Sequence, residues 1–319
     1  MKQPADQRRL AVIDLGSTSF HLLVADLSVE GGLERVDRET EQLRLGAVIE
    51  NPEGIPAEVF DRALATAAGL RATAEALGAE EILPVGTAAL REAANGGELC
   101  LQLAEVLGQP VRLLSGEEEA RVIFAAFQRR LPLPGGPTLG ADLGGGSLEL
   151  AIGDEDGIGF ECTLRLGAAR LHRELVATDP MSRREIHDVC ERVRETLAPH
   201  RTDLLRMPPR IAVATGGSAR ALGHLDLGLH GRPPVASVNG LELRQGELRQ
   251  LTEILVHTTH DERLGLAGIR ERKADLMPTA ALILLVLTEE LGLDGFTLCD
   301  WGLREGILLD AFGDPSHFG

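Results

Sequence analysis

The sequence has few aromatic residues: eight Phe, one Trp and no Tyr in 319 residues. Its hydrophobic fraction is nevertheless 44%, which is normal for a globular protein. The interior must therefore be built mainly from aliphatic side chains. A chain of this length can bury a substantial core, and it predicts one large domain or two of medium size.

Cysteine is also scarce, with four residues at positions 100, 162, 190 and 299. Their separation excludes a small disulfide-stapled domain and shows none of the short spacings of a zinc site. We expect the four thiols to be reduced and buried.

The chain has fewer basic than acidic residues, with 32 Lys and Arg against 49 Asp and Glu, and its net charge is −17. This balance disfavours general binding to nucleic acids or to anionic membrane surfaces. A polyanionic substrate would need metal ions or locally clustered arginines to compensate the charge.

Long hydrophobic runs are missing as well. The most apolar stretch, residues 280–287, is too short to cross a bilayer and lies within a helical pattern. The first nine residues lack the apolar core of a signal peptide. We therefore expect a cytoplasmic protein.

One glycine-rich stretch, residues 142–149, lies between two apolar runs and predicts a strand, a turn and a second strand. Consecutive glycines allow positive φ, and successive N–H groups in such a turn form an anion-binding nest. A phosphate beside two carboxylates would need a divalent cation. The candidates are Gly144, Gly145, Gly146 and Ser147 for phosphate, and Asp142 and Glu149 for metal. An ordinary hairpin with a glycine turn is the alternative.

The same pattern occurs a second time near the N-terminus. A shift of 128 positions places Asp14 on Asp142, and with it Gly16 on Gly144. The second set of phosphate-binding candidates is Gly16, Ser17, Thr18 and Ser19. Such self-similarity predicts two related halves, and ligand pockets often lie between domains.

Three consecutive glutamates follow Ser115. Ser115 and Glu118 fit a capping box, which places a helix start here. Successive helix positions point about 100° apart, so either Glu117 or Glu119 is left to face a cleft. The spacing alone does not choose between them, and compensation of the helix dipole is the alternative interpretation of all three.

The cluster of Pro and Gly at 131–137 predicts a boundary between a first half, residues 1–130, and a second half that restarts after it. Within these halves we expect a strand at about 34–45 and single helices at 182–206 and 273–290. Thr215-Gly216-Gly217-Ser218 predicts a third glycine turn that opens a helix. From the residues alone, a tight strand-to-helix turn explains Gly216 and Gly217. Four arginines of this region are typical of a solvated helix face, with contact to a polyanion as the alternative: Arg183, Arg184, Arg192 and Arg194.

Five motifs, in this order along the chain, resemble those of the exopolyphosphatase and guanosine pentaphosphate phosphohydrolase (Ppx/GppA) family, within the superfamily of actin, heat-shock chaperones and sugar kinases. The motifs are the Asp14 loop to His21, Gly86 to Arg91, Ser115 to Arg121, the Asp142 loop, and Gly302 to Gly306. The resemblance covers essentially the whole chain. Thr18 departs from the family's usual Asn, and it offers one donor where an amide offers two.

The resemblance implies an α/β fold of two actin-like (ribonuclease H-like) domains, related by internal duplication, with an interdomain cleft. It implies a phosphoanhydride hydrolase of the short form, without the family's C-terminal helical domain. Glu119 would be the catalytic base and Arg91 a phosphate clamp. Asp142, Glu149 and Asp14 would hold Mg²⁺, the turn at Gly216 would border the phosphate cleft, and residues 303–319 would pack back on the first domain and leave 131–302 as the second. Apart from the resemblance, we expect a homodimer, because a binding channel extended across a two-fold axis would help to hold a long polyanion.

Several functions remain open at this stage. The substrate implied first is the end of inorganic polyphosphate, and guanosine pentaphosphate is the near alternative. A phosphotransferase of the sugar-kinase type lacks a convincing catalytic Asp. A non-enzymatic actin-like nucleotide switch is disfavoured by the glutamate stretch together with Arg91.

Overall fold

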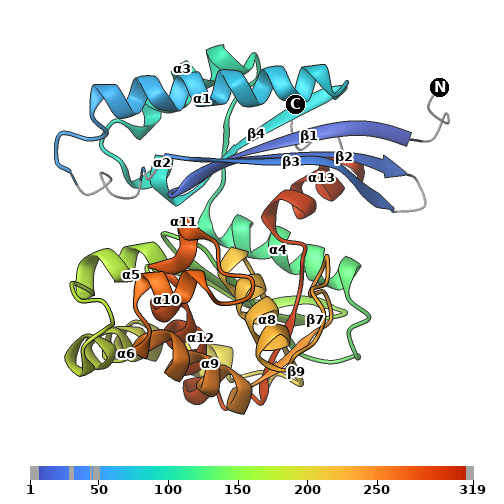
Figure 1. The fold of residues 1–319 in the computed structure, drawn as a ribbon. Coiled ribbons are helices and arrows are strands. Elements are labelled where there is room, and N and C mark those ends of the chain that lie inside the picture. The colour runs from blue at the N-terminus through green and yellow to red at the C-terminus, as the bar shows by residue number, and fades with distance from the viewer. Residues whose placement is uncertain (1–6, 29–31, 44, 46–50, 314–319) are drawn as a thin grey trace. The chain divides into compact units, whose positions relative to one another are not determined.

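The computed structural model describes residues 7–28, 32–43, 45 and 51–313. The chain forms two compact units, residues 1–122 with 303–319 and residues 123–302 (Figure 1). Each unit is an α/β layer structure with its own sheet.

The first unit is built on a mixed sheet, which in the described residues has five strands in the order β3-β2-β1-β4-β5. They are β1 (Gln7–Leu15), β2 (Ser19–Ser28), β3 (Leu33–Gln42), β4 (Glu81–Gly86) and β5 (Arg112–Leu113). The strands β1, β2 and β3 are antiparallel neighbours, and β4 and β5 run parallel to β1.

Both faces of this sheet are covered. Side chains alternate between faces along a strand, so Ala11 and Ile13 of β1 pack beneath α1 (Ala57–Ala76) and α3 (Gly96–Leu107). Leu10 and Val12 point to the other face and contact α13 (Leu303–Gly313). Figure 1 shows α1 and α3 on one side of the sheet and α13 on the other. The short α2 (Ala88–Glu92) and α4 (Gly116–Arg130) follow β4 and β5.

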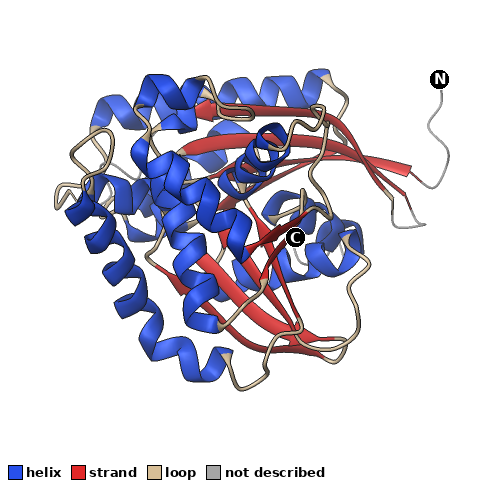
Figure 2. Cartoon of the chain, turned by 60° about the horizontal axis from the view of Figure 1, so that its bottom comes forward, coloured by secondary structure: helices blue, strands red, loops and turns tan. Residues whose placement is uncertain are grey.

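The second unit repeats the arrangement with a sheet whose described strands are in the order β10-β11-β9-β6-β7-β8. Figure 2 shows the strands of the protein in red and the helices in blue. They are β6 (Thr138–Leu143), β7 (Leu148–Asp154), β8 (Gly157–Leu164), β9 (Ile211–Thr215), β10 (Glu242–Arg244) and β11 (Gly295–Leu298). As in the first unit, an antiparallel hairpin (β6–β7) lies beside a parallel strand (β9). The expected internal duplication in an α/β fold is confirmed.

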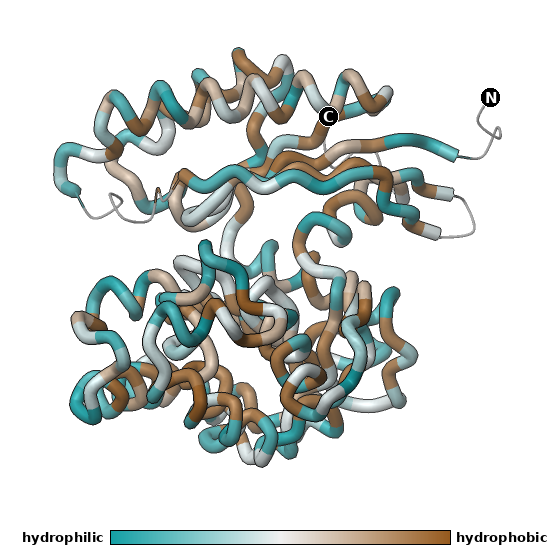
Figure 3. The backbone as a smooth tube through the Cα atoms, in the orientation of Figure 1, coloured by the Kyte–Doolittle hydropathy of each residue, from teal (hydrophilic) through white to brown (hydrophobic). Residues whose placement is uncertain are grey.

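The helices of this unit are α5 (Ala168–Leu175), α6 (Arg183–Leu197), α7 (Arg201–Leu204), α8 (Gly217–Leu229), α9 (Gln245–His257), α10 (His260–Leu264), α11 (Glu271–Ala274) and α12 (Met277–Leu291). Nearly every residue of α12 is buried, because this apolar helix is packed on several sides by α5, α6, α8 and α9. Its hydrophobic residues appear in brown in Figure 3.

Several expected boundaries were wrong for identifiable reasons. The expected helix at 182–206 breaks after Leu197, where Pro199 cannot donate a backbone hydrogen bond and a 3₁₀ turn intervenes. The expected helix at 273–290 is two helices, with Pro278 in the first turn of the second. The strand β3 ends at Gln42 rather than near 45, and Arg44 lies outside the described residues. All four thiols are free, but Cys100 and Cys190 are only partly buried.

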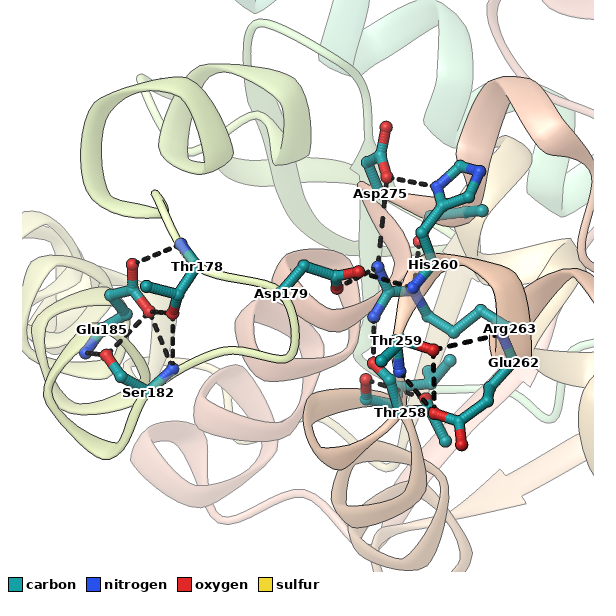
Figure 4. A network of polar contacts seen from close by, with 12 residues as sticks. Thr178, Asp179, Ser182, Glu185, Thr258, Thr259, His260, Glu262, Arg263 and Asp275 are labelled. Atoms are coloured by element: carbon teal, nitrogen blue, oxygen red, sulfur yellow. Dashed lines mark hydrogen bonds and ion pairs between the residues drawn. The ribbon is translucent and has the colours of Figure 1, made fainter.

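A carboxylate organises the segment between α5 and α6 (Figure 4). Glu185 accepts hydrogen bonds from the backbone N–H groups of Ala177, Thr178 and Ser182 at 2.6, 2.9 and 2.7 Å. It also accepts the hydroxyl hydrogens of Thr178 and Ser182. Burial by itself would raise the pKa of Glu185, but these hydrogen bonds outweigh burial and lower the pKa to about 2.

A buried arginine ties this segment to the helices that follow α9. Arg263 donates to the carbonyl of Ala274 at 2.7 Å and to the carboxylate of Asp179 at 2.7 Å. The backbone N–H of His260 donates to the other oxygen of Asp179 at 2.6 Å (Figure 4). This network fixes α10 and α11 against the loop before α6.

Glu185→Gln should lower the free energy of unfolding by about 1–2 kcal/mol near neutral pH, because the charged acceptor of a capping box is lost. The folded-state pKa of Glu185 is depressed, so its contribution is complete above pH 4.5 and disappears as the pH falls toward about 2. Urea unfolding of the wild type and the variant should therefore differ at pH 6, and the difference should shrink steadily as the pH falls toward 2. Glu191→Gln, on the same helix but in an exposed pair with Arg194, is the control and should show a small difference.

Candidate functional site

The loop of the first unit connects β1 to β2 at residues 15–19. Asp14 lies at the end of β1, opposite His21 of β2 and beside Val85 of the parallel strand β4. Ser17 and Ser19 are buried within the loop. The predicted phosphate loop therefore lies where β1 and β4 both end, directly before α2.

Arg91 and Glu119 are in direct contact. Arg91, from α2, donates from Nη1 both to the Glu119 carboxylate and to the carbonyl of Leu114. Glu119 is only 4% exposed. The structure thus brings together the predicted phosphate clamp and the predicted base in a buried, charge-assisted hydrogen bond.

The neighbouring glutamates have other environments. Ser115 and Glu118 form the predicted capping box, with the Ser115 N–H donating to Glu118 at 2.7 Å and the Glu118 N–H donating to Ser115 Oγ at 3.1 Å. Glu117 is exposed. Of the two alternatives left open by spacing, Glu119 is the one that contacts Arg91.

Asp14 lies among charges of its own unit. Burial raises its pKa to about 6, although the positive charges of Arg304 and Arg38 act in the opposite direction and Glu305 adds to the rise. A cation bound close to Asp14 would stabilise the charged form of this carboxylate and lower its pKa.

The loop of the second unit is held from one side by α5. The N–H groups of Ala168, Ala169 and Arg170 donate to the carbonyls of Gly144 and Gly145 at 3.0–3.1 Å. These donors are the orphan N–H groups at the start of α5. In a trans peptide the N–H points opposite to the carbonyl, so the amides that follow these carbonyls point away from α5. The positive φ that the glycine run allows is not used, because Gly144, Gly145 and Gly146 all keep a negative φ. The loop nevertheless turns the amides of Gly145 and Gly146 away from α5, where they can donate to an anion.

Two further residues hold this loop in place. The side chain of Arg170, only 3% exposed, donates from Nε to the Gly146 carbonyl at 2.9 Å. Gly167 lies so close to the loop that a Cβ there would be 2.2 Å from the Gly146 carbonyl carbon and 2.3 Å from the Gly145 oxygen. Sequence analysis missed both, because neither carries a signal until the loop and α5 are folded together.

The two predicted metal ligands of this unit are neighbours across the hairpin. Asp142 of β6 pairs directly with Glu149 of β7, so both side chains project from the same face of the sheet. Glu149 is 5% exposed. No group of three or more His, Cys, Asp or Glu residues that could hold a metal exists among the described residues. Mg²⁺ is commonly bound by one or two carboxylates with waters and substrate phosphates, and this donor pair fits that pattern.

Gly216 lies beside this pair. It adopts a φ of +96°, and a Cβ there would be 2.6 Å from the Leu143 carbonyl and 2.9 Å from Asp142 Oδ1. Only glycine fits this position without strain. The turn before α8 is thus packed against the end of β6, which places the predicted residue beside Asp142.

A cation that sequence analysis missed lies at the same turn. A Cβ on Gly217 would be 2.3 Å from Nζ of Lys273, so the ammonium group lies directly on the backbone at the start of α8. One feature of the sequence could have pointed to Lys273: it is one of only two lysines in the chain.

A model of the Ppx/GppA phosphatase family matches residues 23–314. The chain belongs to this family. Exopolyphosphatase 1 of Mycobacterium tuberculosis is 30% identical over 306 residues, covering 94% of this chain and 87% of the relative. The guanosine-5'-triphosphate,3'-diphosphate pyrophosphatase of Vibrio cholerae is 27% identical over 318 residues, covering 98% of this chain and 61% of the relative.

Solved structures of the Ppx/GppA family share the fold. An exopolyphosphatase from Cytophaga hutchinsonii aligns with a TM-score of 0.87 and 25% identity over 96% of this chain and 98% of that one. The Aquifex aeolicus family member aligns with a TM-score of 0.83 and 23% identity over 98% and 99%. The resemblance stated from the motifs is confirmed, and with it the two-domain actin-like fold and the expectation of an enzyme. Among the described residues, no helix is both long and apolar enough to cross a membrane.

Gly167→Ala should displace the Ppx/GppA loop at 144–146, because the added methyl group meets loop backbone rather than a flexible side chain. We expect a loss of about 1–3 kcal/mol in unfolding free energy, as for overpacking in a core, together with weaker phosphate binding. Gly246→Ala in α9 is the matched control, since nothing lies within 4 Å of a Cβ there and alanine favours helix. Thermal melts with and without orthophosphate would compare them, and equal melting temperatures would contradict the predicted clash.

Proposed function

We propose that the protein is a Mg²⁺-dependent exopolyphosphatase, which hydrolyses the terminal phosphoanhydride of inorganic polyphosphate and releases orthophosphate. The observation that carries the proposal is the buried contact between Arg91 and Glu119. In this contact Arg91, the proposed phosphate clamp, lies against Glu119, the proposed base. Proteins similar to this chain include two that are named exopolyphosphatase.

Different groups of the site bind the phosphoryl group and activate the attacking water. Backbone amides of the two loops, 15–19 and 144–147, bind phosphate oxygens through hydrogen bonds. Arg91 offers a planar fork that matches two oxygens of one phosphate. Asp142 and Glu149, with Asp14 as a further ligand, would hold Mg²⁺, which would offset the charge of the substrate.

Glu119 accepts the proton of the attacking water. In the free protein its carboxylate is hydrogen-bonded to Arg91. When the guanidinium turns its N–H groups to substrate oxygens, the carboxylate keeps the lone pairs it needs to orient a water in line with the scissile bond. The contact with Arg91 therefore positions Glu119 beside the phosphoryl group that Arg91 would bind.

Guanosine pentaphosphate is the second candidate substrate, with the same chemistry at its 5' end. The relative from Vibrio cholerae supports it. Polyphosphate is favoured because the exopolyphosphatase relative is more similar and is matched over most of its own length.

Further proposals concern the setting of the enzyme. We propose that it acts in the cytoplasm, where both substrates would be found. We also propose a homodimer, because extending a binding track across a two-fold axis would help to retain a long chain. Sedimentation with and without long-chain polyphosphate would test the second proposal.

Glu119→Gln should lower turnover about 10²- to 10⁴-fold, the usual contribution of a general base. Glu117→Gln is the matched control, because Glu117 precedes Glu119 by two positions on the same helix but is exposed. Phosphate release should be measured from long-chain polyphosphate and from guanosine pentaphosphate side by side. A near-normal rate for Glu119→Gln would remove this residue from the role. Release mainly from the nucleotide would reverse the order of the two substrates.

Asp142→Asn should raise the Mg²⁺ concentration needed for half-maximal activity, because an amide oxygen is a weaker ligand than a carboxylate. Asp156→Asn, in the exposed turn between β7 and β8, is the control. Metal titrations of both variants at saturating polyphosphate would show the difference. An unchanged titration for Asp142→Asn would argue against metal ligation there.

A further inference from the structure

One motif of the sequence has no part in the proposed chemistry, namely Gly302 to Gly306 at the start of α13. The helix is anchored beneath the central strands by Ile307 and Leu308, which share a core with Leu10 and Val12 of β1. Its first turn is therefore held rigidly within the first unit.

A glycine brings this turn close to α4. A Cβ on Gly306 would be 2.5 Å from the Val122 carbonyl, so any side chain there would force the two helices apart. Val122 lies one helical turn beyond Glu119 on α4. The close crossing thus places the first turn of α13 near the helix that carries the proposed base.

Arg304 is the residue of this turn that lacks an explanation. Its Nη1 is buried and finds no acceptor among the described residues. An arginine N–H withdrawn from water without an acceptor costs free energy. Its charge acts on Asp14, at the end of β1 directly before the loop at 15–19.

An acceptor next to this loop would satisfy the Nη1 group of Arg304. Two carboxylates of the protein already lie in this region, those of Asp14 on β1 and Glu305 on α13, and Glu305 raises the pKa of Asp14. The loop itself was assigned to phosphate by its amides and hydroxyls. A phosphate oxygen held by the loop would supply the acceptor that Arg304 lacks, in the fork geometry for which arginine is suited.

We propose that Arg304 binds a non-bridging oxygen of the substrate phosphate that lies on the loop at 15–19. The inference rests on the proposed function and adds a second arginine to Arg91. It makes α13, which returns from the far end of the chain, part of the phosphate site of the first unit.

The test measures binding of long-chain polyphosphate with Mg²⁺ in the Glu119→Gln background, where turnover should be slow, while phosphate release is followed in the wild type. Adding Arg304→Gln should weaken binding about 10- to 100-fold, the usual worth of a hydrogen bond between charged groups. Arg304→Lys should restore part of the loss, because the charge is kept but the fork is not. Arg8→Gln is the control, since Arg8 lies on β1 far along the strand from Asp14 and pairs with Glu81.

Melting temperatures without ligand separate a binding role from a structural one. If Arg304 binds substrate, Arg304→Gln should melt close to the parent protein and show a reduced shift with polyphosphate. A lower melting temperature with the full ligand-induced shift and unchanged affinity would show that Arg304 is structural, and would overturn the inference alone. A wild type that neither binds polyphosphate nor releases phosphate from it would overturn the proposed function and this inference together.

Discussion

In each unit the central hairpin is buried on both faces of its sheet. Leu10, Ala11, Val12 and Ile13 of β1 are successive residues and none is exposed. The strands therefore have no face left for a ligand, and polar chemistry is confined to their ends. A substrate can therefore meet this fold at the turns 15–19 and 144–147 and at the first turns of the helices that follow β4, β5, β9 and β11. This constraint explains why the candidate residues come from loops far apart in the chain.

The second consequence concerns charge. A chain with a net charge of −17 is a poor general partner for a polyanion. The candidate site relies instead on groups with fixed direction. The amides of the 144–147 loop are oriented because α5 and Arg170 hold the carbonyls of the same peptides. Arg91 is oriented by the Leu114 carbonyl and Glu119. Preorganised dipoles of this kind act locally, so the net charge of the surface matters little to them.

The sequence predicted those features that depend on local chemistry. The capping box at Ser115 formed as predicted, because its hydrogen bonds join residues three apart. The hairpins around Asp14 and Asp142 also formed as predicted, since glycine turns between apolar runs leave few alternatives. The errors fell at element ends, where Pro199 and Pro278 divide helices that the apolar pattern alone would continue. The spacing of apolar residues indicates which face of a helix is buried. It does not indicate where a proline, which lacks a backbone N–H donor, ends the helix.

By itself, the sequence determined the two-fold repeat, the α/β class, the family and the identity of the residues that could bind phosphate or metal. These follow from residue types at fixed spacing. The tertiary structure decided which of those residues meet. It brought Glu119 rather than Glu117 onto Arg91, and it showed Gly167 and Arg170 supporting the loop at 144–146. It also placed Lys273 on Gly217 and left Arg304 with a buried donor beside Asp14. Contacts of this kind join segments that lie far apart in sequence, and they arise only when helices pack on a sheet at a particular distance and angle.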